Sequence, residues 1–332
     1  MQVAVIGAGY WGPNLVRNFS GNSYIDRVFV YDVNKSRTEF IHKKFPGVFV
    51  LESDSEIFKS DNIDIVVIAT PVDKHFELAY KALETGKHIW VEKPYTSNSK
   101  QAETLNELAY KKGLNIFVDH TFIYTGAVRK MKDIIQNNEL GDILYFDSVR
   151  INLGLFQSDV NVIWDLAPHD LSIMFYLLDK LPISVAANGI ANYYGHENVA
   201  HISVYFDNNC FAHFHVNWTS PVKIRRMLAG GTKKMLVFDD MENSEKIKVY
   251  DSGIDIKEKE GIYNALVQYR IGDMYSPKLV QTEALTLGVD EFIDSIIEKR
   301  SPLTNGVDGY NVVRILEAAD ESIKQQGKLI IL

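Results

Sequence analysis

The sequence feature that most constrains the fold is a glycine pattern directly after the first apolar stretch. Residues 2–6 are mostly apolar, Gly7-Ala8-Gly9-Tyr10-Trp11-Gly12 follows at once, and an amphipathic stretch runs from Asn14 to Phe19. A G-x-G-x-x-G pattern between a strand and a helix is typical of a dinucleotide-binding βαβ unit. Its glycines allow a tight turn, a close approach of the backbone to a pyrophosphate, and packing of the helix on the strand. We therefore expect Gly7, Gly9, Tyr10, Trp11 and Gly12 to bind a dinucleotide.

An acidic residue ends the second predicted strand. Residues 28–31 are apolar, and Asp32 follows them 20 residues after Gly12. At this spacing a carboxylate holds the ribose 2′-hydroxyl and repels a 2′-phosphate, so the pattern favours NAD over NADP. The alternative interpretation is a turn residue, because Asp-Val-Asn is a turn-forming sequence.

Apolar stretches and predicted helices then alternate as far as residue 118. The stretches at 48–51, 64–69, 88–91 and 115–118 are separated by predicted helices that include 72–84 and 98–112. Continuous Val/Ile-rich strands between helices predict a doubly wound parallel sheet with both faces covered, and ligands of such sheets bind at the carboxyl edge. Thr70 and Pro71 follow one strand at this edge. His75 follows in the next helix and is also expected near the dinucleotide. The alternative interpretation is a histidine on the helix surface.

Glu92, Lys93 and Pro94 follow the stretch His88-Ile89-Trp90-Val91. The proline ends the strand, so the pattern predicts that Lys93 lies at the carboxyl edge of the sheet. A lysine at this place could serve the dinucleotide and the substrate together. Its alternative is an ordinary solvent-exposed lysine at the end of a strand.

After Val118 the pattern changes to longer, alternating strands. Strands are predicted at 143–153, 184–192, 200–206, 210–218 and 225–229, with an antiparallel hairpin around Asp207-Asn208-Asn209 and closing helices at 283–299 and 309–326. No element is predicted for 239–277. The sequence thus predicts an N-terminal Rossmann domain, residues 1–121, and an α+β domain with a large, mostly antiparallel open sheet, residues 122–332.

Asp165 and His169 stand four residues apart at the start of an apolar helical run. This spacing places both side chains on one helix face, where the carboxylate would orient the imidazole as a general base. We expect Asp165 to be the N-cap and Pro168 to lie in the tolerant first turn. The alternative is a simple helix cap beside a core histidine.

Composition limits the partners. The chain carries 35 Lys and Arg against 43 Asp and Glu, a net charge of −8, which argues against nucleic acid and anionic membranes. No apolar stretch is long enough to span a membrane, and the single cysteine, Cys210, fits a reducing compartment, so a cytoplasmic protein is expected. His213 and His215 share one strand face, but without further ligands in a recognisable spacing we predict no metal site.

The strand–GAGYWG–helix unit, Thr70-Pro71, Glu92-Lys93-Pro94 and Asp165-x-x-x-His169, in this order, resemble the glucose–fructose oxidoreductase / inositol dehydrogenase / rhizopine-catabolism (Gfo/Idh/MocA) family over essentially the whole chain. The resemblance implies an NAD-dependent sugar dehydrogenase acting on a CH–OH group, and a homo-oligomer, a dimer or tetramer, formed through the C-terminal sheet. It makes Lys93, Asp165 and His169 the catalytic residues, with Glu92, Thr70, Pro71 and His75 beside the cofactor. His169 would accept the hydroxyl proton and Lys93 would stabilise the developing alkoxide.

One departure from the family pattern bears on the substrate. The Gly-Gly that often precedes the aspartate is replaced by Asn161-Val162-Ile163-Trp164, which puts simple glucose or inositol specificity in doubt. The sequences around Tyr10 and Trp164 resemble the branch that oxidises position 3 of nucleotide-linked hexoses, so UDP-N-acetylglucosamine or its uronic acid is expected, in cell-surface glycan or lipid A-type sugar synthesis. His120, Arg150, Asn152 and Asn161 are further candidate sugar contacts, with Lys93 and His169. A free-sugar or polyol dehydrogenase and a non-catalytic NAD-binding regulator remain alternatives.

Overall fold

The chain divides into two units that each contain separate stretches of sequence. The computed structural model describes residues 1–154, 160–193, 195–207, 209–257 and 266–332. The first unit comprises residues 1–124 and 282–317, and the second comprises 125–281 and 318–332. The sequence predicts one boundary after residue 121. In the structure the first unit ends at Tyr124 and the second begins at Thr125. Residues 282–317, which follow the second unit in the sequence, belong to the first unit.

The first unit contains a parallel sheet with the strand order typical of a dinucleotide-binding domain. The strands of this sheet in the described chain are β1 (Gln2–Ile6), β2 (Arg27–Tyr31), β3 (Phe49–Val50), β4 (Ile65–Ile68), β5 (His88–Val91) and β6 (Ile116–Val118). They pair in parallel in the order β3-β2-β1-β4-β5-β6. This order reverses between β1 and β4, which is where doubly wound sheets bind dinucleotides. The predicted Rossmann fold of this unit is confirmed.

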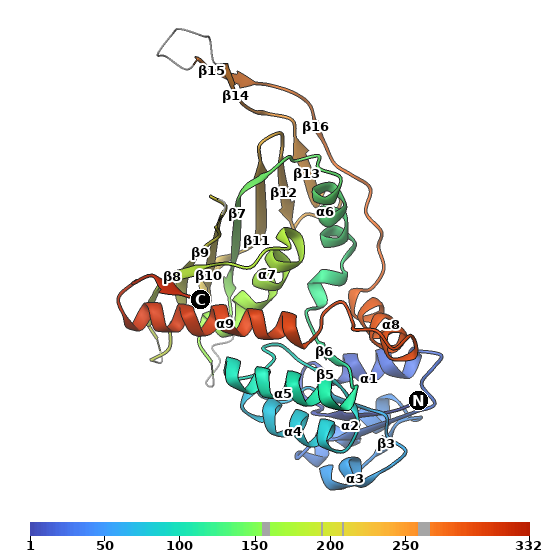
Figure 1. The fold of residues 1–332 in the computed structure, drawn as a ribbon. Coiled ribbons are helices and arrows are strands. Elements are labelled where there is room, and N and C mark those ends of the chain that lie inside the picture. The colour runs from blue at the N-terminus through green and yellow to red at the C-terminus, as the bar shows by residue number, and fades with distance from the viewer. Residues whose placement is uncertain (155–159, 194, 208, 258–265) are drawn as a thin grey trace. The chain divides into compact units, whose positions relative to one another are not determined.

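Helices connect these strands, as Figure 1 shows in blue and cyan. The helices of the first unit are α1 (Gly12–Gly21), α2 (Lys35–Lys44), α3 (Asp54–Lys59), α4 (Val72–Glu84), α5 (Ser99–Lys112), the short 3-10 helix η1 (Thr121–Tyr124) and α8 (Ala284–Ile297). Helix α9 (Gly306–Lys324) begins in the first unit and ends in the second. The central strands β1, β4, β5 and β6 are almost entirely buried, as continuous Val/Ile strands require, whereas β2 is partly exposed and β3, at the edge, is exposed.

Helix α8 belongs to the first unit because it supplies part of that unit's aromatic core. Phe292 lies against Phe117 with ring centroids 5.4 Å apart, and against Trp90 at 5.9 Å. Trp90 and Phe117 themselves stack at 3.9 Å between β5 and β6. Gly288 faces the same rings closely, since a Cβ there would lie 3.3 Å from Trp90. This burial of apolar surface explains why residues far along the chain return to the dinucleotide-binding sheet.

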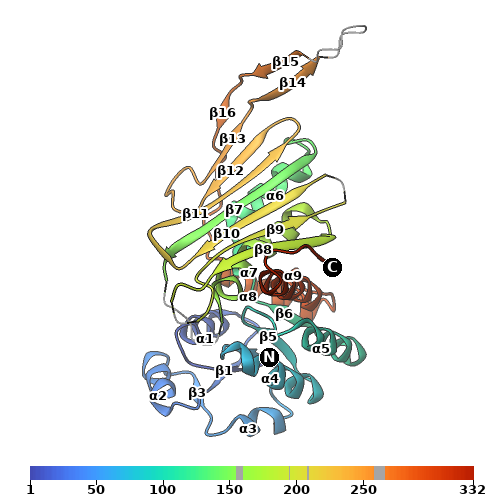
Figure 2. The same ribbon diagram turned by 90° about the vertical axis from the view of Figure 1, so that its left-hand side faces the viewer.

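The second unit is built on a large, mostly antiparallel sheet, seen broadside in Figure 2. Among the described residues its nine strands run in the order β16-β13-β12-β11-β7-β10-β9-β8-β17. They are β7 (Ile143–Leu153), β8 (Ser184–Ile190), β9 (Val199–Tyr205), β10 (Phe211–Asn217), β11 (Thr219–Gly231), β12 (Met235–Asp239), β13 (Ile247–Tyr250), β16 (Met274–Tyr275) and β17 (Ile330–Ile331). Only β7 with β10 pairs in parallel in this described sheet. The predicted open antiparallel sheet is confirmed.

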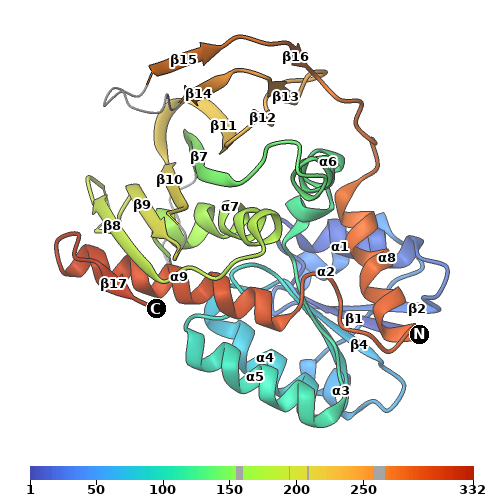
Figure 3. The same cartoon turned by 45° about the horizontal axis from the view of Figure 1, so that its top comes forward.

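Helices α6 (Gly126–Gln136) and α7 (Val162–Leu178) lie on one side of this sheet, as Figure 3 shows. Helix α7 is almost entirely apolar apart from its first turns, and it contacts β7, β9 and β10. On β10 the buried residues Ala212, Phe214 and Val216 alternate with the half-buried His213, His215 and Asn217. The alternation therefore directs the histidines to the sheet side away from α7.

Residues 239–277, which the sequence leaves without elements, contribute strands. They include β13, β16 and the two-stranded ribbon β14 (Gly253–Lys257) with β15 (Leu266–Arg270). Residues 258–265 of this stretch, and Asn208 of the predicted hairpin, lie outside the described residues. The antiparallel pairing of β9 with β10 confirms that hairpin. In the described part of the chain, no helix has both the length and the apolar character needed to cross a membrane.

Candidate active site

The glycine pattern forms the turn that the sequence predicts. Gly7 has a φ of +102°, and a Cβ on it would lie 2.3 Å from the Ala69 carbonyl oxygen. A Cβ on Gly12 would lie 2.3 Å from the Gly7 carbonyl oxygen. Around Gly9, by contrast, a Cβ would meet only the Arg37 guanidinium, at 3.7 Å. Gly7 and Gly12 therefore close the turn, and Gly9 leaves an open approach to the backbone, as a pyrophosphate requires.

Asp32 lies beside this turn and is tied to it. Its side chain is 4% exposed, with one carboxylate oxygen accepting a 2.7 Å hydrogen bond from the Ala8 amide. The other oxygen accepts one of 2.7 Å from the Asn34 amide. Asp32 thus links the glycine turn after β1 to the segment after β2. It has the turn role of the alternative interpretation, and it also lies where the sequence predicts the ribose site.

The end of β4 supplies Thr70, Pro71 and His75 to the same edge. Pro71 is the residue before α4, and His75 is buried in that helix's first turn, so the alternative of a surface histidine is wrong. Its ring nitrogens lie 2.8 Å from the Thr70 carbonyl oxygen and 2.9 Å from that of Pro94. Burial lowers the pKa of His75, which keeps the ring neutral at pH 7. His75 therefore joins the segment after β4 to the segment after β5.

Glu92 and Lys93 follow β5 immediately, and Glu92 shares its surroundings with a second acid. Burial, and then the charge of Asp119, raise the pKa of Glu92 well above its ordinary value. Burial also raises the pKa of Asp119, which hydrogen-bonds with Glu92. Two carboxyl groups in contact in a dry site cannot both ionise cheaply, so the pair holds a proton to a higher pH than an isolated carboxyl group does. It lies next to Lys93 and next to the glycine turn.

Asp119 is a site residue that the sequence interpretation missed. Its side chain is buried, with the residue 1% exposed. It accepts a hydrogen bond of 3.3 Å from the Trp11 indole and one of 2.5 Å from the Thr121 hydroxyl. Because Trp11 belongs to the glycine turn, Asp119 links this turn to the end of β6. The signal in the sequence is the position of Asp119 directly after a predicted strand, at the carboxyl edge of the sheet, where ligands bind. His120 follows it, and burial and Lys93 lower the pKa of His120 to about 3, so the ring is neutral.

Two independent observations indicate that the residues at this edge of the first sheet are suited to a bound dinucleotide. Besides the open backbone at Gly9, three predicted site residues of the first unit carry buried polar atoms with no hydrogen-bond partner in the described chain. These atoms are Thr70 Oγ1, Glu92 Oε1 and both ring nitrogens of His120. Buried polar groups are almost always hydrogen-bonded, so unsatisfied ones at a ligand-binding edge indicate a site that a ligand completes.

In the second unit, α7 begins earlier than predicted. The prediction that Asp165 caps this helix is wrong, because Asn161 is the N-cap and accepts hydrogen bonds of 3.1 Å from the amides of Ile163 and Trp164. Pro168 is consequently inside the helix rather than in its first turn. The Asn161 amide group also donates to Glu197 at 3.1 Å and to Asp320 at 3.0 Å. The structure therefore gives Asn161 a structural role.

Asp165 and His169 lie one turn apart on α7, and both are half-buried. The Trp218 indole donates a 3.0 Å hydrogen bond to an Asp165 carboxylate oxygen. Trp218 directly follows β10 and is 53 residues away from Asp165, so no local pattern in the sequence predicts this contact. It holds the carboxylate on the helix face that carries His169, as a carboxylate that orients an imidazole must be held.

Arg150 and Asn152 lie on β7, with different surroundings. Arg150 is 3% exposed and forms a two-pronged ion pair with Asp170, with Nε and Nη2 at 2.8 and 2.5 Å from one oxygen. Ser148 donates to the other oxygen at 2.8 Å. A buried pair of this geometry joins the sheet to α7. Asn152 is half-buried near the end of the strand, where its role as a sugar contact stays a prediction.

The histidines on β10 form a stack with a third one. His201 of β9 pairs with His215, and their rings stack at 4.3 Å, with His213 at 5.5 Å from His201. Burial, followed by the neighbouring rings, lowers the pKa of His201 and of His215. Among the described residues, no group of three or more His, Cys, Asp or Glu side chains is arranged to hold a metal ion.

The sheet and the glycine turn are typical of a dinucleotide-binding unit, and Lys93 lies at the edge where ligands of such sheets bind. Residues 1–120 match the family described as "Oxidoreductase family, NAD-binding Rossmann fold", and residues 128–237 match the "GFO/IDH/MocA C-terminal domain". The chain belongs to the Gfo/Idh/MocA family of oxidoreductases.

Relatives of this family differ in what they act on. The chain is 25% identical to scyllo-inositol 2-dehydrogenase (NADP(+)) IolW of Bacillus subtilis (strain 168), over 99% of this chain and 97% of that protein. It is 24% identical to UDP-N-acetylglucosamine 3-dehydrogenase of Acidithiobacillus ferrooxidans, over 94% of each. A solved structure of the latter enzyme covers 98% of each chain with a TM-score of 0.83 at 23% identity, which confirms the fold.

Proposed function

We propose that this chain is an NAD-dependent dehydrogenase that oxidises position 3 of a nucleotide-linked hexose, UDP-N-acetylglucosamine or its uronic acid. One observation carries the proposal: the open glycine turn, Asp32 and buried polar atoms without hydrogen-bond partners in the described chain lie at the same edge of the first sheet as Lys93. Family membership supports the oxidoreductase chemistry. The sequence around Trp164, and the 24% identity to a UDP-N-acetylglucosamine 3-dehydrogenase, support the sugar.

In the proposed reaction each side chain has a separate task. A bound NAD would supply the acceptor for the hydride of the sugar carbon. Lys93 donates a hydrogen bond to the sugar oxygen and stabilises the negative charge that develops there. His169 accepts the hydroxyl proton, and Asp165, held by Trp218, orients the imidazole ring. The raised pKa of Glu92, beside Asp119, limits the negative charge next to Lys93.

A polyol is the second candidate substrate. The similarity to scyllo-inositol 2-dehydrogenase spans 99% of this chain, so a cyclic polyol deserves the same tests as the nucleotide sugars. The two substrates differ in size and charge, because only the nucleotide sugar carries a diphosphate. Both would present a secondary hydroxyl to Lys93 and His169.

Thermal-shift measurements test which class binds. A ligand specific for the native state stabilises it by RT ln(1 + [L]/Kd), so saturating ligand raises the melting temperature. With NADH present, we expect UDP-N-acetylglucosamine or its uronic acid to add a further rise, and scyllo-inositol, glucose and UDP alone to add less. A rise with scyllo-inositol and none with the UDP-sugars would favour the polyol.

We also propose that the protein is a cytoplasmic homo-oligomer that associates through the sheet of the second unit. The sheet side away from α7 carries the stacked imidazoles of His201, His213 and His215, with Phe211 beside them. Apolar and weakly polar rings gathered on a sheet face are typical of a protein–protein contact. A buried Cys210 fits a reducing compartment.

A further inference from the structure

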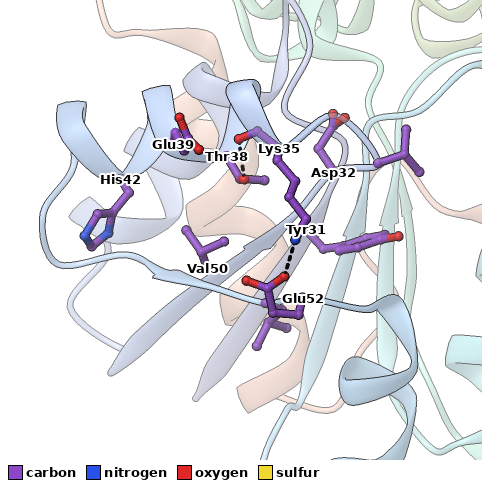
Figure 4. Close-up of a pocket in the computed structure, with 10 residues that line it drawn as sticks. Tyr31, Asp32, Lys35, Thr38, Glu39, His42, Val50 and Glu52 are labelled. Carbon is purple, nitrogen blue, oxygen red and sulfur yellow. Dashed lines mark hydrogen bonds and ion pairs between the residues drawn. The ribbon is translucent and has the colours of Figure 1, made fainter.

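The carboxyl edge of the first sheet has two ends with different chemistry. A pocket of about 240 Å³ beside the end of β2, with Asp32 at one side (Figure 4), lies where the sequence predicts the ribose. In the sheet, β1, β4 and β5 separate β2 from β6, so four strand spacings, about 19 Å, lie between these two strands. Lys93, which is proposed to contact the reacting sugar oxygen, follows β5, and His120 lies two residues after β6. His120 therefore lies toward the lysine and away from the ribose.

Lys93 and His120 are neighbours beyond the ends of β5 and β6. Val91 pairs with Val118 in the parallel ladder. The Asp119 amide donates a 2.8 Å hydrogen bond to the Val91 carbonyl oxygen, so the pairing continues one residue beyond β6. Lys93 and His120 each lie two residues after the paired valines. The lysine charge acts on the imidazole, since burial and then Lys93 lower the pKa of His120 to about 3.

The ring of His120 is buried without the hydrogen bonds that a buried histidine normally has. The residue is 1% exposed, and neither ring nitrogen has a hydrogen-bond partner in the described chain. His75, in the same unit and equally buried, shows the ordinary case, since its two ring nitrogens lie 2.8 and 2.9 Å from carbonyl oxygens. A neutral imidazole carries one donor and one acceptor, so His120 offers both to a ligand beside Lys93.

We propose that His120 is a catalytic residue whose neutral ring donates a hydrogen bond to the same sugar oxygen as Lys93. The proposal rests on the proposed function and adds a second donor to it. In the reaction His169 takes the hydroxyl proton, the hydride of the sugar carbon leaves for the bound cofactor, and the carbonyl bond forms. His120 keeps its own proton throughout. Two donors held in place stabilise the negative charge on the oxygen more than one does, and a neutral ring adds no second positive charge beside Lys93.

Steady-state rates with a UDP-sugar and NAD test this hydrogen bond. His120→Leu has roughly the same side-chain volume and no nitrogen atoms, so we expect kcat to fall about a hundredfold, as for a lost oxyanion donor. The NADH dissociation constant, measured by nucleotide fluorescence, should change less than about threefold, because the contacts at the glycine turn are unchanged. His120→Gln keeps a donor and an acceptor and should recover part of kcat. It should also leave the acidic limb of the kcat profile in place, since the base is His169.

Melting of the unliganded protein tests the buried nitrogens without any activity. A buried polar group without a partner destabilises the native state, so its removal should stabilise the fold. We expect His120→Leu to melt about 2–4 °C above the wild type. His88→Leu is the matched control, because His88 is half-buried in β5 and its Nδ1 accepts a 2.9 Å hydrogen bond from the Asn115 amide. This control should melt below the wild type and keep the wild-type kcat.

Three results would overturn the proposal. Wild-type kcat in His120→Leu would show that the sugar oxygen does not need this donor. A loss of NADH binding as large as the loss of kcat would make His120 a cofactor contact. A melting temperature that falls as in His88→Leu would give the ring a structural role. If the wild type oxidises no UDP-sugar at all, the proposed function is wrong, whatever the His120 variants do.

Discussion

At the scale of single residues, the account depends most on Lys93. Replacing it with methionine keeps much of the side-chain volume but removes the positive charge that stabilises the sugar oxygen. We expect Lys93→Met to lower kcat by about 10²–10³ while NADH binding and the melting temperature stay close to wild type. Lys74→Met, which removes an exposed lysine from α4 of the same unit, should leave kcat unchanged. Wild-type turnover in Lys93→Met would remove this lysine from the mechanism.

Glu92 makes a prediction about pH and stability. Its pKa is raised in the native protein, so between the ordinary glutamate value, about 4.3, and the raised value the native state holds a proton that the unfolded state releases. Its contribution to stability is complete below that ordinary value and is lost as the pH rises through the native pKa. The wild-type free energy of unfolding should therefore fall more between about pH 5 and pH 8 than that of Glu92→Gln.

Chemical denaturation across this pH range provides the measurement. Glu107→Gln, at an exposed position of α5, serves as the control and should follow the wild-type profile. Should Glu92→Gln lose as much stability with rising pH as the wild type, the buried acid pair does not hold its proton in the native state.

At the scale of secondary-structure elements, a substitution at the start of α7 distinguishes a structural role of Asn161 from a role in sugar binding. Asn161 caps this helix through two amides and donates to Glu197 and Asp320. We expect Asn161→Ala to lower the free energy of unfolding by about 1–2 kcal/mol. Asn34→Ala, which removes the N-cap of α2 at an exposed site, should lower the free energy of unfolding by less, because Asn34 caps its helix through Ser36 alone. Unchanged stability with a raised KM for the sugar would instead make Asn161 a sugar contact.

Elements defined by strong local patterns could be predicted from the sequence. Helix α4 and strand β7 have the predicted bounds, because apolar periodicity and flanking turn residues determine both. The start of α7 was misplaced because Asn161 and Asp165 are both good caps. The structure extends the helix to include Val162, Ile163 and Trp164, which are buried, and the Trp164 indole donates to Asp320 at 2.6 Å. Tertiary packing thus decided between two local signals.

The same distinction applies to the site. The glycine turn and Lys93 could be recognised because each lies within a contiguous motif. Trp218 could not, because its partner Asp165 is 53 residues away along the chain. For Asp119 the sequence offers only its position directly after a strand, because its partner Trp11 is 108 residues away. The strands between residues 239 and 277 were missed for a related reason, since short strands depend on their neighbours in the sheet.

At the scale of the whole molecule, the proposed assembly has its own test. His213 lies on the sheet side away from α7, beside His201. A glutamate there would place negative charge within the proposed contact, and an unpaired buried charge is strongly unfavourable. We expect light scattering after size exclusion to give a multiple of the monomer mass for the wild type and for Tyr110→Glu, at an exposed site in the first unit, and a smaller mass for His213→Glu. A monomeric wild type would contradict the proposed assembly.

The central claim concerns the reaction, and initial rates of NADH formation with identified products test it most directly. Purified protein with NAD is given UDP-N-acetylglucosamine, its uronic acid or scyllo-inositol at equal concentrations, and each product is analysed by NMR. The account predicts that a UDP-sugar is the best substrate, that one NADH forms for each sugar oxidised, and that the new carbonyl is at position 3. Oxidation of scyllo-inositol with no oxidation of either UDP-sugar, or a carbonyl at another position, would contradict it.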